Sequence, residues 1–269
     1  MNQTERRKFL IKKLLLEEPN VRNIEVPTDP EQQKLLLRAL MNLRLPKEMD
    51  EKFLTIQDEY LKNEIAQKGI MDITDLSPIA EGIYLWQGDI TTLNCDAIVN
   101  AANSGMTGCY VPNHRCIDNC IHTFSGIQLR NFCAKLMARQ GYEEPTGTAK
   151  ITPAFNLPCN YILHTVGPII TGDLTKRDCE LLASCYDSCL NLAARNHLES
   201  VAFCCISTGE FHFPNEKAAE IAIETVKTFL KKSTSVKKVI FNVFKDLDKE
   251  IYERLLRTDK TTEGSHGFR

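Results

Sequence analysis

Two cysteines and a histidine, Cys109, His114 and Cys116, lie close together in the polar segment "NAANSGMTGCYVPNHRC", residues 100–116. Two thiolates and an imidazole suit Zn²⁺, and the spacing Cys-x4-His-x-Cys lets one loop curl around a single ion. A thiol nucleophile activated by His114 is the alternative for the same residues. The sequence supplies no acid to orient that histidine, so the spacing favours a metal site.

The chemistry of such a site depends on its fourth position. A structural zinc site closes with a fourth protein ligand, whereas a catalytic one keeps that position for water or substrate. Cys120 and His122 are the candidate fourth ligands. Cys120 follows Cys116 by four residues, so the two would share a face of a helix that begins near residue 117. The residues alone leave both kinds of site open.

The composition excludes several classes of protein. The chain has 269 residues, a net charge of -2 and 43% hydrophobic residues, with no basic excess that would indicate nucleic-acid binding. Its start lacks the apolar core of a signal peptide, and no segment approaches the roughly 20 apolar residues of a membrane span. Most of the 11 cysteines lie in apolar runs such as "VAFCCIS". These features predict a cytoplasmic protein with free thiols and no membrane partner.

The elements that must position these residues change character along the chain. Residues 1–75 predict an N-terminal helical extension packed on the main domain, with Leu35, Leu36, Ala39, Leu40 and Leu43 as its packed face. From residue 80 to 257, short β-rich runs alternate with helical patterns at about 118–139, 177–197, 215–232 and 246–256. This alternation predicts an α/β domain with a largely parallel sheet and helices on both faces. Residues 258–269 predict a polar C-terminal tail.

Two loops are expected to carry the site, because ligands bind at the carboxyl ends of parallel strands. The first is the cysteine-containing loop after "CDAIV". The second follows "VAFCCI" and begins with Ser207, Thr208 and Gly209, whose backbone N–H groups precede a helix. Such a turn can hold a phosphate or simply cap the helix. If the two strands are close in the sheet, the loops face each other.

Several motifs in order resemble the macrodomain, an ADP-ribose-binding family. "GDIT" precedes a strand ending in "DAIVNAAN", "KITPAFNLPCNYILHTVGP" resembles the middle strands, and "ISTGEFHFP" resembles the diphosphate loop. The resemblance covers about residues 80–257. It implies a three-layer α/β/α fold with a mixed, largely parallel sheet, preceded here by the N-terminal helical extension.

The same resemblance implies an ADP-ribose site. The Asp89 carboxylate would accept a hydrogen bond from the adenine amino group, with the backbone of Ile90 beside it. Asn100 and Asn103 would line the distal ribose. The residues that would wrap the diphosphate and the proximal side are Ser207, Thr208, Gly209, Glu210 and Phe211.

One departure from the common family pattern concerns the first loop, where "GCYVPNHRC" replaces a run of glycines before the helix start "IDNCIH". This departure resembles a zinc-dependent bacterial subclass linked to sirtuin-type ADP-ribosyltransferases. It implies Zn²⁺ on Cys109, His114 and Cys116, with an open position, because "CIH" stands where the family has "AIH". Zinc there would polarise a ribose hydroxyl or activate water.

The resemblance implies a mono-ADP-ribosyl hydrolase that acts on modified, acidic side chains. Asn103 would orient the ribose. Asp118 would position or deprotonate water, or would only stabilise the first turn of its helix. The expected partners are ADP-ribose and a mono-ADP-ribosylated protein, with a lipoyl-carrier protein as a possible target. The alternative is a non-catalytic ADP-ribose reader with a structural zinc.

Overall fold

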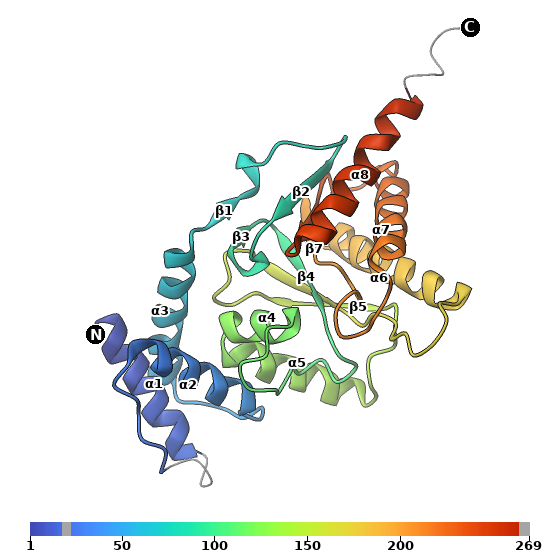
Figure 1. The fold of residues 1–269 in the computed structure, drawn as a ribbon. Helices are drawn as coiled ribbons and strands as arrows, with labels where there is room; N and C mark the ends of the chain where they lie inside the picture. Colours follow the sequence, from blue (N-terminus) through green and yellow to red (C-terminus); the bar gives the residue numbers. More distant parts are fainter. Residues whose placement is uncertain (18–22, 264–269) are drawn as a thin grey trace, which may run out of the picture.

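The N-terminal part of the computed structural model is a bundle of three helices, α1 (Gln3–Glu17), α2 (Pro30–Leu43) and α3 (Glu51–Lys68) (Figure 1). The structure describes residues 1–17 and 23–263. Asp29 and Asp50 cap α2 and α3 by accepting hydrogen bonds from backbone N–H groups in the first turn of each helix. The predicted N-terminal helical extension is confirmed.

The packed face of α2 differs in part from the predicted one, since Leu40 is buried and Leu36 packs against the bundle core as predicted. Leu37, Leu40 and Met41 are buried in the core of the bundle, whereas Leu35 and Leu43 are 45% and 46% exposed. Buried positions three and four residues apart define one stripe of a helix, and this stripe is rotated from the predicted one. The rotation turns Arg38 and Asn42 toward the main domain, where both donate hydrogen bonds.

The main domain is built on a six-stranded sheet with the order β2-β8-β7-β4-β6-β5. All neighbouring pairs are parallel except β5 with β6, so the sheet is mixed and largely parallel, as predicted. Its strands are β2 (Ile83–Gln87), β4 (Ala97–Ala101), β5 (Ala149–Pro153), β6 (Tyr161–Thr165), β7 (Ser200–Phe203) and β8 (Lys238–Val243). Two short parallel strands, β1 (Met71–Asp72) and β3 (Leu93–Asn94), pair beside this sheet.

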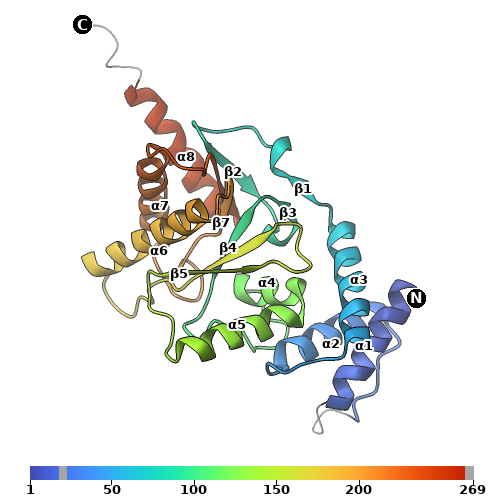
Figure 2. The same ribbon diagram turned by 180° about the vertical axis from the view of Figure 1, so that it is seen from behind.

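Helices cover both faces of the sheet and complete three layers. The helices α4 (Ile117–Ser125) and α5 (Ile127–Gln140) lie on one side, next to the N-terminal bundle (Figures 1 and 2). On the other side lie α6 (Lys176–Arg195), α7 (Asn215–Leu230) and α8 (Asp246–Glu263). A continuous core of buried Val, Ile, Leu, Phe and Cys side chains joins the sheet to the helices. None of the helices in the described residues is long and apolar enough to cross a membrane.

Two helix boundaries differ from the predicted ones. The pattern over residues 118–139 predicted one helix, but Gly126 has φ 96° and separates α4 from α5. A Cβ at this glycine would meet the side chain of Gln57 at 2.6 Å. At the other end of the chain, α8 continues to Glu263, beyond the predicted helix end at residue 256. The remainder of the predicted tail, residues 264–269, lies outside the described residues.

Candidate functional site

The loops that follow β4 and β7 lie side by side at one edge of the sheet. β4 and β7 are parallel neighbours, with Ala97 in register with Val201, so their carboxyl ends meet there. Nε2 of His114 in the first loop lies 3.5 Å from Oε1 of Glu210 in the second. The prediction that the two loops face each other is therefore confirmed.

The first loop brings Cys109, His114 and Cys116 together, with their ligand atoms within 4.8 Å of one another. Cys109 Sγ lies 3.6 Å from His114 Nδ1, and Cys116 is the N-cap of α4. Burial raises the pKa of the Cys116 thiol to about 12, so an ion must displace its proton on binding. Two sulfur atoms and one imidazole at this separation fit Zn²⁺.

Neither of the two candidate fourth ligands, Cys120 and His122, belongs to this group of ligand atoms within 4.8 Å of one another. The Sγ of Cys120 accepts a hydrogen bond from Arg38 Nη2 at 3.3 Å. His122 is buried beneath Gly108, where a Cβ would come within 2.7 Å of the imidazole. The group that contains His122 is a separate one, formed with Cys133 and His164.

The two imidazoles of the buried histidine group differ in their hydrogen bonds. His164 Nδ1 lies 3.1 Å from the Asn100 Nδ2 donor, and His164 Nε2 lies 2.9 Å from Thr152 Oγ1. Burial lowers the pKa of His164 to about 3 and that of His122 well below its usual value, so both imidazoles are neutral. Both ring nitrogens of His164 are occupied by hydrogen bonds, whereas both ring nitrogens of His122 are buried without a hydrogen-bond partner within the described residues.

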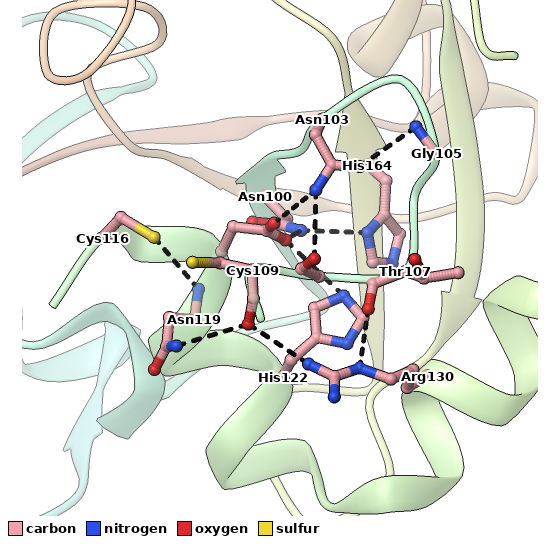
Figure 3. Close-up of polar contacts among 12 residues, drawn as sticks. Asn100, Asn103, Gly105, Thr107, Cys109, Cys116, Asn119, His122, Arg130 and His164 are labelled. Atoms are coloured by element: carbon pink, nitrogen blue, oxygen red, sulfur yellow. Dashed lines mark hydrogen bonds and ion pairs between the residues drawn. The ribbon is translucent and has the colours of Figure 1, made fainter. Parts of the chain in front are cut away.

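Asp118 is buried between Asn100 on β4 and Asn103 in the first loop. Figure 3 shows these two asparagines beside the cysteines of the first loop. Asn100 Nδ2 donates to Asp118 Oδ1 at 2.8 Å, and Asn103 Nδ2 donates to Oδ2 at 3.3 Å. Burial raises the pKa of Asp118 to about 6, although the bonds from Asn100 and Asn103 and the charge of Arg130 oppose this rise. A carboxylate with such a pKa is ionised at neutral pH and is well matched to accept a proton.

Asn103 differs from Asn100 in its exposure. Asn100 is fully buried on β4, whereas Asn103 is exposed beyond the end of that strand. The amide of Asn103 also donates to the carbonyl of Gly108 at 3.1 Å, and its Oδ1 accepts from the N–H of Gly105 at 3.0 Å. Asn103 therefore presents a fixed amide at the surface of the site, directly beside Asp118.

The second loop is a turn closed by its own backbone. The N–H of Phe213 donates to the carbonyl of Ser207 at 2.9 Å, and Ser207 itself has φ 64°. The Ser207 hydroxyl is buried and has no hydrogen-bond partner within the described residues. Gly167 makes room for it, because a Cβ there would lie 2.0 Å from Ser207 Oγ. The loop therefore begins with a buried hydroxyl whose hydrogen-bonding capacity is unused within the described residues.

Asp89 lies at a different part of the molecule, where the main domain meets α3. Its Oδ2 is 2.8 Å from Lys68 Nζ, and its Oδ1 accepts from the N–H and hydroxyl of Thr91. These bonds lower the pKa of Asp89 even though burial, the largest single effect, raises it. Asp89 also lines an open groove of about 580 Å³, next to the short 3-10 helix that begins at Ile90.

Comparison with known proteins identifies the family to which this chain belongs. Residues 99–222 match the model of the Macro domain. The chain is 60% identical over 260 residues to the "Protein-ADP-ribose hydrolase" of Treponema medium, covering 95% of this chain and 100% of the relative. The chain belongs to the macrodomain family. A protein of the same name from Staphylococcus aureus strain MRSA252 is 45% identical to this macrodomain, over 94% of this chain and 96% of the relative.

Solved macrodomains share the fold. The Trypanosoma brucei macrodomain in complex with ADP-ribose has a TM-score of 0.64 and 27% identity, covering 86% of this chain and 97% of that one. A mutant Oceanobacillus iheyensis macrodomain with ADPR has a TM-score of 0.62 and 34% identity, covering 69% of this chain and 98% of that one. The second comparison covers nearly all of the Oceanobacillus protein but only 69% of this chain, as expected if that protein lacks a counterpart of the N-terminal helices.

Arg130 of α5 supports the first loop of this macrodomain, and sequence reasoning missed it. The guanidinium donates to the carbonyls of Thr107 at 2.7 Å and Cys109 at 3.3 Å in the first loop. It also donates to three carbonyls at the end of α2, those of Met41, Asn42 and Arg44. Backbone carbonyls carry no sequence signature, and an arginine in a helical pattern usually indicates a surface position. No local signal could have identified Arg130.

Arg38 and Asn42 of α2 were missed for a similar reason. Asn42 Oδ1 accepts from the N–H of Asn113 at 3.0 Å, and Arg38 donates to the carbonyl of His114 at 2.8 Å. Both contacts join residues more than 70 positions apart in the chain. The sequence shows only that Arg38 and Asn42 are four residues apart and so share one side of a predicted helix. It does not show that this side contacts the first loop.

Proposed function

We propose that this macrodomain is a zinc-dependent mono-ADP-ribosyl hydrolase that removes ADP-ribose from modified acidic side chains of a target protein. The names of its relatives, at 60% and 45% identity over nearly the whole chain, support hydrolysis of protein-linked ADP-ribose. The observation that carries the proposal is the position of Asp118. It is a buried carboxylate with a pKa of about 6, between Asn100 and Asn103 and two residues from Cys116.

ADP-ribose would lie along the carboxyl edge of the sheet. Asp89 and the backbone of Ile90 would hold the adenine, which requires the Asp89 carboxylate to exchange its contact with Lys68. The second loop, from Ser207 to Phe211, would hold the diphosphate with its N–H groups and the unpartnered Ser207 hydroxyl. Asn103 would orient the distal ribose through its exposed amide.

Cys109, His114 and Cys116 would hold Zn²⁺ next to this ribose. When bound, the ion supplies Lewis acidity toward a ribose or water oxygen. Asp118 accepts the proton of the attacking water, because it is ionised above pH 6 and its two oxygens are held in place by Asn100 and Asn103. Attack of the water at the anomeric carbon breaks the bond from that carbon to the side-chain oxygen. Attack at the ester carbonyl breaks the acyl–oxygen bond instead, and the departing ribose oxygen takes the proton that Asp118 accepted. Either route frees the carboxyl group of the target protein.

The partners in this proposal follow from the family resemblance. A sirtuin-type ADP-ribosyltransferase would attach the ADP-ribose that this macrodomain removes. The target would be a lipoyl-carrier protein. Both partners rest on the resemblance alone, and neither is needed for the chemistry at Asp118.

The test uses a protein carrying glutamate-linked ADP-ribose, incubated with the wild type and with the variants Asn103→Ala and Cys116→Ala. We expect both variants to lose at least about 100-fold in the rate of release, the size of effect that general acid–base or metal assistance provides. Matched controls are Asn63→Ala on the exposed face of α3 and Cys179→Ala on α6, which should release at the wild-type rate. Metal content and ADP-ribose affinity are measured on each sample.

Two results would contradict the proposal in different ways. Wild-type protein that binds ADP-ribose but releases none from the substrate would identify a reader with a structural zinc. Undiminished release by a chelator-treated protein shown to contain no metal would leave a hydrolase but remove the zinc.

A further inference from the structure

The N-terminal bundle contacts the metal-binding loop through two side chains of α2, Asn42 and the guanidinium of Arg38. Arg38 Nη2 donates to the carbonyl of His114 at 2.8 Å, to Asn119 Oδ1 at 3.0 Å and to Cys120 Sγ at 3.3 Å. Arg38 Nε is buried without a hydrogen-bond partner within the described residues. The guanidinium is therefore oriented by the loop and the start of α4 and not by solvent.

Asn119 extends this contact to the first part of the loop. Its Nδ2 donates to the carbonyl of Val111 at 3.0 Å, while its Oδ1 accepts from Arg38. The loop is thus held on both sides of His114, by α2 and by the first turn of α4. This arrangement fixes the backbone that carries the histidine and the cysteine on either side of it.

We propose that Arg38 is a positioning residue that keeps Cys120 away from the metal and so leaves the fourth coordination position open. The inference rests on the proposed zinc site. Cys116 and Cys120 are connected by the first backbone hydrogen bond of α4, from Cys120 N to Cys116 O at 3.0 Å. Residues four apart on a helix share a face, so Cys120 is the nearest additional thiol along that face.

In this proposal, the hydrogen bond from Arg38 determines whether the Cys120 sulfur can bind the metal. A sulfur that accepts a hydrogen bond from a guanidinium is directed toward α2, and Cys120 lies outside the group formed by Cys109, His114 and Cys116. Without that donor, Cys120 becomes available as a third thiolate, and three cysteines with one histidine form a closed structural zinc site. The N-terminal bundle, in this account, is what distinguishes a catalytic site from a structural one.

The experiment is X-ray absorption at the zinc edge on the full chain loaded with one equivalent of Zn²⁺. We expect two sulfur ligands in the wild type, three in Arg38→Met and two in the double variant Arg38→Met/Cys120→Ser. Competition with a chromophoric chelator should show zinc binding about tenfold weaker in the double variant than in Cys120→Ser, because the brace on His114 is lost. Arg6→Met, on α1, is the matched control and should keep two sulfur ligands.

Circular dichroism establishes that each variant is folded, and Arg38→Gln, too short to reach the loop, replaces Arg38→Met where that variant does not fold. Two sulfur ligands in every variant, with zinc affinity unchanged, would overturn the role of Arg38 and leave the proposed function intact. Three sulfur ligands in the wild type would also overturn it, because Cys120 would then be a ligand already. A wild type that binds no zinc would overturn the metal site and the role of Arg38 together.

Discussion

The two loops that form the site are held in different ways. The second loop, residues 204–213, is closed by short-range backbone hydrogen bonds, from Phe213 to Ser207 and from His212 to Gly209. The first loop, residues 102–116, depends on side chains from three other elements: Arg38 and Asn42 on α2, Asn119 on α4 and Arg130 on α5. The second loop also receives one backbone hydrogen bond from outside, from the N–H of Ile170 to the carbonyl of Phe211. It relies mainly on its own backbone, whereas the first loop relies mainly on side chains from other elements.

This difference explains why the N-terminal bundle belongs to the functional unit. A diphosphate needs N–H groups on a turn, which a local sequence can supply. A three-ligand metal site needs fixed positions for atoms up to seven residues apart in the chain, which an irregular loop supplies only when it is braced. The bundle and α5 provide that brace. Substitutions at the braces should therefore affect metal binding and leave the second loop intact, and the reverse should hold for substitutions near the second loop.

The largest expected effect is that of Arg130→Met. The change removes the donors for five backbone carbonyls, those of Met41, Asn42, Arg44, Thr107 and Cys109. Because buried carbonyls without partners are costly, we expect the free energy of unfolding to fall by about 3 kcal/mol or more. Zinc affinity should fall more than ADP affinity, as measured by chelator competition and calorimetry.

The matched control for this prediction is Arg139→Met, in the exposed last turn of the same helix. It should change the free energy of unfolding by less than about 0.5 kcal/mol, as is usual for surface positions. Equal losses of zinc and ADP affinity in Arg130→Met would show that the two loops are not held independently.

Gly167→Ala tests the second loop. The added Cβ would lie 2.0 Å from Ser207 Oγ and 2.9 Å from Ile206 Cγ2, so Ser207 must move. We expect a loss of about 1–3 kcal/mol in stability, as for other overpacked positions, with ADP affinity reduced and zinc affinity unchanged. Denaturant unfolding and calorimetric titration with ADP measure the two effects.

Two variants sharpen this prediction. Gly172→Ala has no atom within 4 Å of the added Cβ and should behave as the wild type. In the double variant Gly167→Ala/Ser207→Gly, the clashing hydroxyl is absent and glycine suits the positive φ of residue 207, so stability should recover. If stability in the double variant does not recover, the contact between residues 167 and 207 is not the cause.

The smallest expected effect concerns Asp118, whose pKa is about 6 in the folded protein against an ordinary value of 3.8. The ionised carboxylate therefore opposes folding, by an amount that grows from about pH 4 to pH 6 and then stays constant. Asp118→Asn should raise the free energy of unfolding by about 1 kcal/mol at pH 7, less than the full shift implies because the amide offers one acceptor in place of two.

Unfolding measured from pH 4 to pH 8 checks this sign. The gain in stability of Asp118→Asn over the wild type should shrink as the pH falls from 7 to 4, because the carboxyl group takes up its proton below about pH 6 in the folded chain and only near pH 3.8 in the unfolded chain. A gain that is the same at pH 4 and pH 7 would mean that Asp118 is not the group whose charge opposes folding. The same variant should lose hydrolysis at every pH.

The sequence predicted the sheet, the helical layers and the facing loops because those features follow from short patterns of residues. It also identified Cys109, His114 and Cys116, whose proximity the loop confirms, and Asp118 as a residue at the start of a helix. It could not identify Arg130 or Arg38, because their partners are backbone carbonyls and a thiol that only the folded chain brings near them. The predicted packed face of α2 was partly wrong for a related reason. The helix has more leucines than one face can bury, and packing against α1 and α4 determines which of them are buried.

The most direct measurement is anomalous diffraction at the zinc edge from crystals grown with Zn²⁺ and ADP-ribose. The account predicts one strong peak at about 2.3 Å from the sulfur atoms of Cys109 and Cys116 and about 2.0 Å from a ring nitrogen of His114, the usual zinc bond lengths. The distal ribose should lie beside that peak, with Asn103 and Asp118 next to it. A peak among His122, Cys133 and His164, or none at the Cys-His-Cys loop, would contradict the account.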